Sequence, residues 1–167
     1  MEEYIKAWFL LKVISKEFGL GSMDGFQFNI SVGYDLAGIK SEKVDTFLNT
    51  MQHAQDSEIF KHCKAYLLEH VDLFEKVTAE DIESISGDIC NSVTISTLHG
   101  CPPEEIEKIA MYLITEKGFH TFIKCNPTLL GYEYARKTMD DMGYDYIAFG
   151  DFHFKDDLQY EDAVPML

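Results

Sequence analysis

Short segments typical of β-strands alternate with helical segments along this chain, and this alternation constrains the fold more than any other feature. Residues 26–32 alternate apolar and polar side chains strictly, which is the period of a half-buried strand. The predicted strands are residues 26–32, 93–98, 121–125 and 144–149. Strands that alternate with helices predict an α/β fold with a parallel sheet and helical crossovers. The order of elements does not distinguish a barrel from a doubly wound sheet.

Helices are predicted on either side of the first strand. Residues 2–18 place apolar side chains at helical spacing and end at a glycine-rich stretch, so residues 1–25 form a leading helix and turn. Ser41 is predicted to cap a helix that runs to about Gln55. Two further helices are predicted within residues 56–90, which we interpret as a helical insertion between βα units.

Proline, threonine and glycine set the predicted bounds of the later helices. Pro102 and Pro103 sit in the first turn of a helix, where a missing amide donor costs little, and Gly118 ends that helix. Thr128 is predicted to cap the next helix, which Gly143 ends. At this length we predict that the whole chain forms a single α/β domain.

Acidic residues dominate the charge of the chain. Its 167 residues include 29 Asp and Glu but only 14 Lys and Arg, which gives a formal net charge of −15, and Arg136 is the only arginine. Lys and Arg supply the affinity for nucleic acids and anionic membranes, so neither partner is expected. Residues 150–167 are acidic, and we interpret them as an irregular, solvated segment.

The N-terminus and the cysteines favour a cytoplasmic protein. Glu2 and Glu3 lie where a signal peptide carries positive charge, and no apolar stretch approaches the roughly 18 residues of a membrane span. The four cysteines form no C-x-x-C motif, so neither an iron–sulfur cluster nor a zinc ribbon is expected in this chain. Reduced thiols are the default in that compartment.

In parallel α/β folds the functional residues lie in the loops that follow the strands. The first such loop contains Ser31 and Gly33, and we expect both near a cofactor, because a glycine lets a ligand approach the backbone closely. Tyr34 and Asp35 follow and are candidates for ligand contact. A tight turn that requires glycine explains Gly33 equally well.

The second loop places His99 and Cys101 just ahead of a helix. The positive end of a helix lowers the pKa of a thiol, so Cys101 is a candidate acid/base or redox group and His99 a candidate substrate contact. A structural loop and a pair of metal ligands remain open as alternatives. Two ligands do not make a metal site, and we assign none.

The third loop contains Lys124 and Asn126. A lysine at the end of an apolar strand is costly to bury unless its ammonium meets a partner or a ligand. At such a place Lys124 can stabilise negative charge that develops on a cofactor or substrate, and Asn126 can hydrogen-bond the same molecule. The alternative is a lysine whose ammonium reaches water at the rim of the sheet.

Long stretches of the chain resemble one protein family. They are residues 28–36, 91–106, 122–132 and 158–167, and they are similar to the selenate reductase subunit family of the YgfK type. The similarity covers most of the chain, and its long matching strings are more specific than any short motif. It implies a large cytoplasmic protein whose N-terminal part is similar to the flavin-binding (β/α)₈ barrel of dihydroorotate and dihydropyrimidine dehydrogenases.

The resemblance also implies what surrounds this chain. Family members further on look like the small subunit of glutamate synthase, with FAD, an NAD(P) site and 4Fe-4S clusters. Residues 1–167 would then be an internal fragment of the N-terminal part, namely a partial TIM-barrel-like, FMN-linked oxidoreductase-like fragment with four of about eight strands. The other domains of the parent protein and redox partner subunits are the partners that this implies.

Some positions of this sequence match the site residues of those dehydrogenases, and others differ from them. Lys124 matches a lysine that they place on the flavin ring, and Cys101 is the candidate for their acid/base cysteine. Thr97, in the same loop as Cys101, is a candidate contact for the cofactor. The dehydrogenase pattern has an Asn and then Ser-Cys-Pro in this loop, whereas residues 96–99 here are Ser-Thr-Leu-His. This departure speaks against pyrimidine chemistry.

Two functions follow as expectations. The first is an FMN-linked oxidoreductase module of a multidomain iron–sulfur flavoprotein, in which Lys124 polarises the flavin, Asn126 hydrogen-bonds the flavin or the substrate, and Cys101 transfers a proton. The second is a scaffold without a cofactor that docks the redox domains or partner subunits, with the acidic residues 150–167 as the interaction surface.

Overall fold

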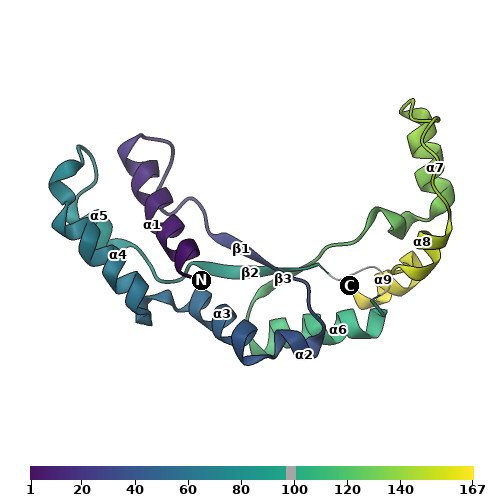
Figure 1. Ribbon diagram of the computed structural model, residues 1–167, viewed down its shortest axis with the longest axis horizontal. Helices are drawn as coiled ribbons and strands as arrows, with labels where there is room; N and C mark the ends of the chain where they lie inside the picture. Colours follow the sequence, from purple (N-terminus) through teal and green to yellow (C-terminus); the bar gives the residue numbers. More distant parts are fainter. Residues whose placement is uncertain (97–100) are drawn as a thin grey trace. The chain divides into compact units, whose positions relative to one another are not determined.

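The computed structural model describes residues 1–96 and 101–167, in which three strands alternate with helices (Figure 1). The strands are β1 (Phe28–Val32), β2 (Cys90–Ile95) and β3 (His120–Ile123), and they pair in the order β1-β2-β3. They run parallel, with helical segments connecting each strand to the next. The α/β prediction is confirmed, and the sheet that these residues form is open rather than closed into a barrel.

The helices account for most of the remaining chain. The α-helices are α1 (Glu2–Glu17), α2 (Leu36–Ile39), α3 (Glu42–Gln52), α4 (Glu58–Glu69), α5 (Ala79–Ser84), α6 (Pro103–Met111), α7 (Tyr132–Asp141), α8 (Phe152–Asp156) and α9 (Tyr160–Met166). Single turns are η1 (Ala54–Asp56), η2 (Val71–Leu73), the π-helical η3 (Tyr112–Glu116) and η4 (Pro127–Leu130). The predicted leading helix, the two helices of residues 56–90 and the helix after Pro102 are confirmed. Among the helices that the structure describes, none is long and apolar enough to cross a bilayer.

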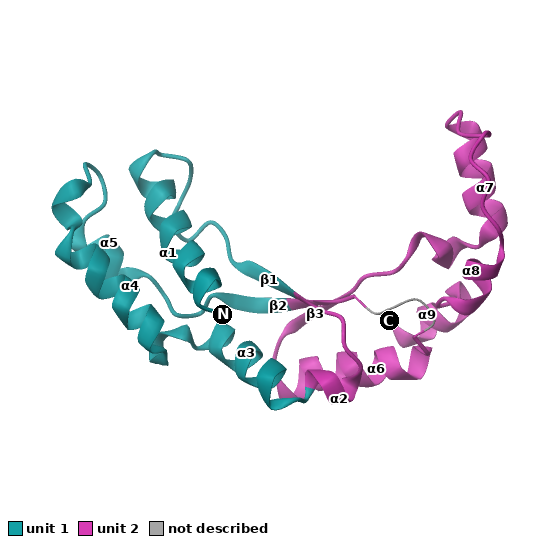
Figure 2. Ribbon diagram, viewed as in Figure 1, with its two compact units in different colours: residues 1–30, 40–92 teal, residues 31–39, 93–167 magenta. Residues whose placement is uncertain are grey.

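The chain divides into two compact units, which Figure 2 colours separately. Unit 1 comprises residues 1–30 and 40–92, and unit 2 comprises residues 31–39 and 93–167. The division falls inside β1 and inside β2, so each of these strands contributes residues to both units. The predicted site residues that the structure describes, namely Ser31, Gly33, Cys101, Lys124 and Asn126, belong to unit 2.

Unit 1 is built around the buried face of α1, which packs on α4. Trp8 lies edge-on to the rings of Phe26 and Phe28, with ring centroids 5.5 Å apart in each pair. The indole N–H of Trp8 donates to the carbonyl of Ser86 at 2.9 Å. These contacts join the leading helix to the segments that precede β1 and β2.

A second cluster in unit 1 lies further along α1. Its buried members are Val13, Val77 and Ile82, and the partly buried side chains packed against them are Leu67, Leu68, Val71 and Phe74. Thr78 and Asp81 form a capping box at the start of α5, which satisfies two amide donors reciprocally. The helices of residues 56–90 are therefore packed on α1 rather than standing apart from it.

Unit 2 is organised by α6, which contacts α2, α9 and η3. Ile106, Ile109 and Leu113 are buried at the helical spacing predicted for the inner face of this segment. Pro102 is the N-cap and Pro103 the first helical residue, as their places in the sequence predict. The helix that follows β2 thus packs its apolar face inward and presents Glu104 and Glu105 in its first turn.

The predicted fourth strand, residues 144–149, is wrong. These residues form turns and irregular backbone, and Arg136 of α7 binds two of their carbonyls. Its guanidinium donates to the carbonyl of Ile147 at 2.6 Å and to that of Tyr144 at 3.2 Å, and it lies over the ring of Phe149. The segment is therefore held against the helix before it.

Two further expectations need correction. Residues 150–167 are not irregular, since they contain α8 and α9.

Thr128 does not cap the helix after β3, because it lies in η4. The helix α7 begins after Gly131, whose φ of +83° places it in the left-handed region. That conformation favours glycine, which allows the sharp change from the 3₁₀ turn to the helix.

Candidate functional site

The candidate site is the edge of the sheet where the three strands end. The backbone N–H of Ser96 donates to the carbonyl of Val32 at 2.8 Å, and that of Lys124 donates to the carbonyl of Ile95 at 2.9 Å. A Cβ added at Gly33 would lie 3.0 Å from the carbonyl oxygen of Ser96. The residues at the ends of the three strands therefore lie next to one another. Because Gly33 has no side chain, the carbonyl of Ser96 can approach its backbone closely.

Toward the carboxyl ends of the strands, one face of this sheet is packed and the other is more exposed. Ile30 and Val32 of β1 are buried, and so are Val93 and Ile95 of β2. Because successive side chains of a strand point to opposite faces, Ser31 lies on the other face, and it is exposed. The same alternation places Thr94, Phe122 and Lys124 on that open face, where Phe122 and Lys124 are exposed.

Lys124 therefore stands at a strand end, as predicted, but not in an apolar setting. Its exposure removes the desolvation cost that the sequence argument assumed. An exposed lysine at this strand end agrees with both interpretations of Lys124, a ligand contact and a lysine at the rim of the sheet. The structure adds that Ser31, Gly33 and Lys124 lie at the same edge of the sheet.

Asn126, in the loop after β3, is held by the C-terminal segment. Its side-chain N–H donates to Asp157 Oδ2 at 3.5 Å, and the hydroxyl of Thr128 donates to the same oxygen at 2.6 Å. Asp157 is only 6% exposed. The carboxylate thus fixes the loop after β3 through its short bond from Thr128, while its contact with the Asn126 amide is near the limit for a hydrogen bond.

Sequence reasoning missed Asp157, which it placed in a solvated acidic segment. Its partners lie 31 and 29 residues earlier in the chain, and no local spacing links them. The neighbouring acids Asp156, Glu161 and Asp162 are exposed, so composition alone does not single out the one that is buried.

Cys101 is half-buried just ahead of α6, and its electrostatics differ from the expectation. Burial raises the pKa of its thiol, and the Glu105 carboxylate raises it further. The same carboxylate accepts the backbone N–H of Leu36 at 3.0 Å. The predicted lowering of this pKa by the helix is therefore wrong, because desolvation and a nearby acid outweigh the helix end. Both effects favour the protonated thiol of Cys101.

Two predicted site residues, Thr97 and His99, lie outside the described residues. Within residues 1–96 and 101–167, no three His, Cys, Asp or Glu side chains are placed to hold a metal ion. Cys63, Cys90, Cys101 and Cys125 are all free thiols. The remaining candidates are Ser31, Gly33 and Lys124 at the sheet edge, Asn126 in the adjoining loop, and Cys101 at the start of α6.

Comparison with known proteins identifies the family. The family model "Oxidoreductase YgfK, N-terminal TIM-barrel domain" matches residues 1–167. The curated proteins named "Putative oxidoreductase YgfK" from Escherichia coli strain K12 and from Escherichia coli O157:H7 are each 40% identical over 181 residues. The alignments cover 99% of this chain and 17% of each relative, so this chain spans about a sixth of their length. No solved structure matches. The chain belongs to the family of YgfK-type oxidoreductases and corresponds to their N-terminal TIM-barrel domain.

Proposed function

We propose that this chain supplies the flavin-facing part of an FMN-linked oxidoreductase module in a longer YgfK-type protein. The observation that carries the proposal is the meeting of Gly33, Ser96 and Lys124 at one edge of the sheet. In parallel α/β folds this edge, at the carboxyl ends of the strands, is where cofactors and substrates bind. The open face beside it gives a planar ring system access to the strands.

The residues at this edge fit the ring of a flavin. A bound flavin accepts a hydride and carries negative charge on its ring when it is reduced. The exposed ammonium of Lys124 can stabilise that charge. Gly33 presents no side chain at the adjoining strand end, and Ser31 offers a hydroxyl on the same face.

The phosphate of FMN needs a different partner. Arg136, the only arginine of the chain, donates to two carbonyls and to the Asp140 carboxylate. The formal net charge of −15 also opposes an anionic group. We therefore infer that this chain binds the ring and that other parts of the longer protein bind the phosphate.

Cys101 and Asn126 serve the substrate side in this proposal. Burial and Glu105 raise the pKa of Cys101 and so favour its protonated form, from which it can give a proton to a substrate. The amide of Asn126 directs a hydrogen bond toward the flavin or the substrate. Asp157, which accepts the hydroxyl of Thr128 in the same loop at 2.6 Å, holds that loop and is a positioning residue.

Substitution of Lys124 in the longer protein tests the proposal. Lys124→Met removes the ammonium and keeps the stem, and we expect about a tenfold loss of flavin affinity, the value of one hydrogen bond from a charged donor. The reduction potential of the bound flavin should fall as well, because the reduced anion loses its counter-charge. Lys108→Met, at an exposed position of α6, is the matched control. Equal flavin content and potential in both variants would rule out this role for Lys124.

A second candidate function is a docking scaffold without a cofactor. Exposed aromatic side chains on and after α7 favour it: Tyr134 is 58% exposed, Tyr146 76% and Phe152 58%. Large exposed aromatics commonly mark protein interaction sites. On this proposal the surface binds the redox domains or partner subunits.

The scaffold is tested by binding of this chain to the rest of the YgfK-type protein, supplied separately. Neutralising the exposed acids Asp156, Glu161 and Asp162 tests the acidic surface, and Asp157 is left out because it is buried. Tyr134→Ser and Tyr146→Ser together test the aromatic one. Binding that neither set weakens would count against the scaffold.

A further inference from the structure

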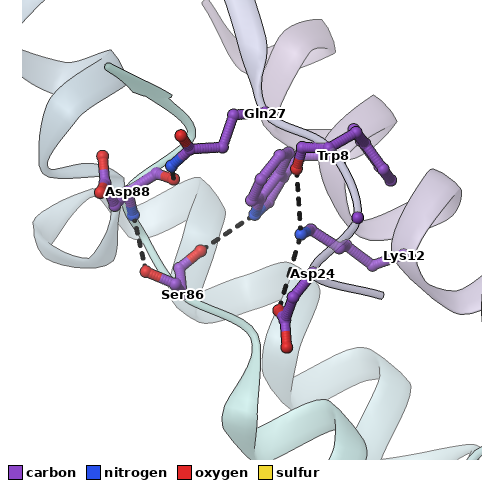
Figure 3. Close-up of a pocket in the computed structure, with 8 residues that line it drawn as sticks. Trp8, Lys12, Asp24, Gln27, Ser86 and Asp88 are labelled. Carbon is purple, nitrogen blue, oxygen red and sulfur yellow. Dashed lines mark hydrogen bonds and ion pairs between the residues drawn. The ribbon is translucent and has the colours of Figure 1, made fainter. Parts of the chain in front are cut away.

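The helix α1 uses one of its sides for the core of unit 1. Its buried residues recur at the spacing of a single helix face, and they are Ile5, Trp8, Phe9, Lys12 and Val13. Figure 3 shows two of them, Trp8 and Lys12, pointing toward the segments ahead of β1 and β2, where they line a pocket. A surface helix usually carries one apolar stripe and is polar elsewhere. On this pattern, the other side of α1 should be polar.

The other side of α1 is instead apolar. A second set of residues recurs at alternating intervals of three and four, which keeps its members on one face of a helix. We call this set the outer seam, and it consists of Tyr4, Ala7, Leu11, Ile14 and Phe18. Tyr4 is 52% exposed, Leu11 42% and Phe18 69%, and Leu10 beside them is 58% exposed. Exposed apolar side chains that gather on one face commonly mark an interaction site.

Both ends of the outer seam are held in place. At the start of α1, the ring of Tyr4 lies edge-on to that of Phe47 of α3, with centroids 5.8 Å apart. At the end, the backbone N–H of Leu20 donates to the carbonyl of Ser15 at 2.9 Å across Gly19, whose φ is +65°. This turn commonly packs the residue at the position of Leu20 back on the helix, but Leu20 is 72% exposed. The backbone that carries these apolar side chains is thus ordered before any partner binds, which lowers the entropy lost on binding.

The spacing of the outer seam indicates a helical partner. Alternating intervals of three and four are the pattern by which one helix packs along another. An amphipathic helix with apolar residues at the same intervals would match the seam along its length. An extended peptide instead binds through the backbone at a sheet edge, which a helix does not offer.

The charge of the chain and the size of the seam argue against two other partners. A helix that lies on an anionic membrane is rich in Lys and Arg, whereas α1 has as many acids as lysines and the chain has a formal net charge of −15. Two copies of the chain would repel each other for the same reason. A stable interface between separate proteins also uses about 20–30 residues a side, far more than the outer seam provides.

A helix of the same polypeptide meets these conditions. Because it is tethered, its effective concentration is high, and a small contact is sufficient. The alignments cover 17% of each YgfK relative, so most of the sequence of those relatives lies outside the matched region.

We propose that the outer seam of α1 is the docking site of an amphipathic helix that lies outside residues 1–167 in a longer YgfK-type protein. The apolar face of that helix covers Leu11 and Phe18 and removes them from water. This inference depends neither on flavin binding nor on the acidic and aromatic surfaces of unit 2, so its test is separate from theirs.

Hydroxyl-radical footprinting of the unmodified full-length protein tests whether the seam is covered. The oxidation rate of each side chain is measured by peptide mass spectrometry in the folded protein and in the same protein unfolded in urea. We expect Leu11 and Phe18 to react at least about fivefold more slowly in the folded protein, because side chains at the centre of an interface are packed as tightly as a protein interior. Rates near those of the unfolded protein would overturn the proposal.

A photocrosslink identifies what covers the seam. The photoreactive residue p-benzoylphenylalanine replaces Leu11 in the full-length protein, and a mixture of heavy-isotope-labelled and unlabelled protein separates crosslinks within one polypeptide from those between two. We expect crosslinks from α1 to a helical segment outside residues 1–167 of the same polypeptide. Crosslinks between two copies, crosslinks confined to residues 1–167, or the absence of crosslinks would each overturn the proposal.

Leu11→Glu and Thr46→Glu form a matched pair of variants, because each adds one negative charge at an exposed helical position and Thr46 lies on α3, outside the seam. Leu11→Glu should raise the oxidation rate of Phe18 by about fivefold, because docking a helix over an unpaired carboxylate is too costly. Thr46→Glu should leave that rate unchanged. Phe9, whose ring centroid lies 4.7 Å from that of Phe60, reports whether the core of unit 1 stays folded. A Phe18 that stays protected in Leu11→Glu would contradict the proposal.

Discussion

At the residue scale, Glu17 shows how one carboxylate fixes a long connection. Its Oε1 accepts the backbone N–H of Glu75 at 2.9 Å, and its Oε2 accepts those of Lys76 at 3.0 Å and Val77 at 3.2 Å. These bonds favour the ionised form, and the bond from Glu75 contributes most to the lowered pKa of Glu17. The end of α1 therefore holds the segment that leads into α5.

This pKa shift predicts a pH-dependent contribution to stability. A carboxylate whose pKa is lower in the folded state contributes stability above its unfolded pKa and loses it as the pH falls through the folded value. We expect Glu17→Gln to lower the urea midpoint at pH 7, with a difference from wild type that shrinks as the pH falls below 4.5, the ordinary value for this carboxyl. Glu107→Gln, at an exposed position of α6, is the control. A difference that is constant with pH would contradict this account of Glu17.

Cys101 offers a second test at this scale. Glu105→Gln removes the negative charge that helps to raise the Cys101 pKa and keeps an oxygen for the N–H of Leu36. We expect the rate of Cys101 alkylation by iodoacetamide near pH 8 to increase, because more thiolate is present. Peptide mapping separates this cysteine from Cys63, which serves as the internal control. An unchanged pH profile at Cys101 would mean that Glu105 does not act on it.

At the scale of elements, the close approach at Gly87 joins η1 to the segment before β2. A Cβ at Gly87 would lie 2.5 Å from the backbone nitrogen of Gln55, and the carbonyl of Gly87 accepts the N–H of Ala54 at 2.9 Å. We expect Gly87→Ala to lower the free energy of unfolding by about 1–3 kcal/mol, the usual cost of forcing an extra methyl into a packed position.

Gly150→Ala is the matched control for this substitution. A Cβ there would meet only the ring of Phe152, at 3.1 Å, and that ring is exposed and can move. Chemical denaturation should show little change in this variant. Equal losses in the two alanine variants would contradict the role given to the backbone contact at Gly87.

The elements that sequence predicts are those whose partners are local. The strict alternation of residues 26–32 and the two prolines before α6 depend on neighbours in sequence, and both predictions are confirmed. Residues 144–149 are rich in the aromatic side chains that are common in strands, yet they form no strand. The carbonyls of Tyr144 and Ile147 instead accept hydrogen bonds from Arg136, eight and eleven residues earlier, and strand propensity does not reveal such a contact.

In the candidate site, too, the features that depend on local sequence were predictable and those that depend on tertiary packing were not. The strand-end positions of Gly33 and Lys124 were predictable, because parallel strands bring their carboxyl ends to one edge. Asp157 was not, since its contact with Asn126 depends on the packing of the C-terminal segment. The pKa of Cys101 was predicted in the wrong direction because the burial of its thiol and the nearness of Glu105 are tertiary features.

At the scale of the whole molecule, the extent of the chain and its open sheet bear on where a flavin could bind. It spans 17% of the YgfK relatives that it matches, and its described strands form an open, three-stranded sheet. An open sheet edge presents unpaired backbone groups, and a TIM barrel closes its sheet with eight strands. We propose that the flavin ring binds to this chain and the phosphate to residues elsewhere in a longer protein.

Titration of this chain with riboflavin and with FMN, followed by flavin fluorescence, tests that central claim most directly. We predict saturable binding in the micromolar range for both, with FMN no tighter than riboflavin, because the chain recognises the ring and not the phosphate. Lys124→Met should weaken both about tenfold, while Lys108→Met should bind like wild type. Absence of saturable binding of either flavin, or equal affinity in the Lys124→Met chain, would contradict the account.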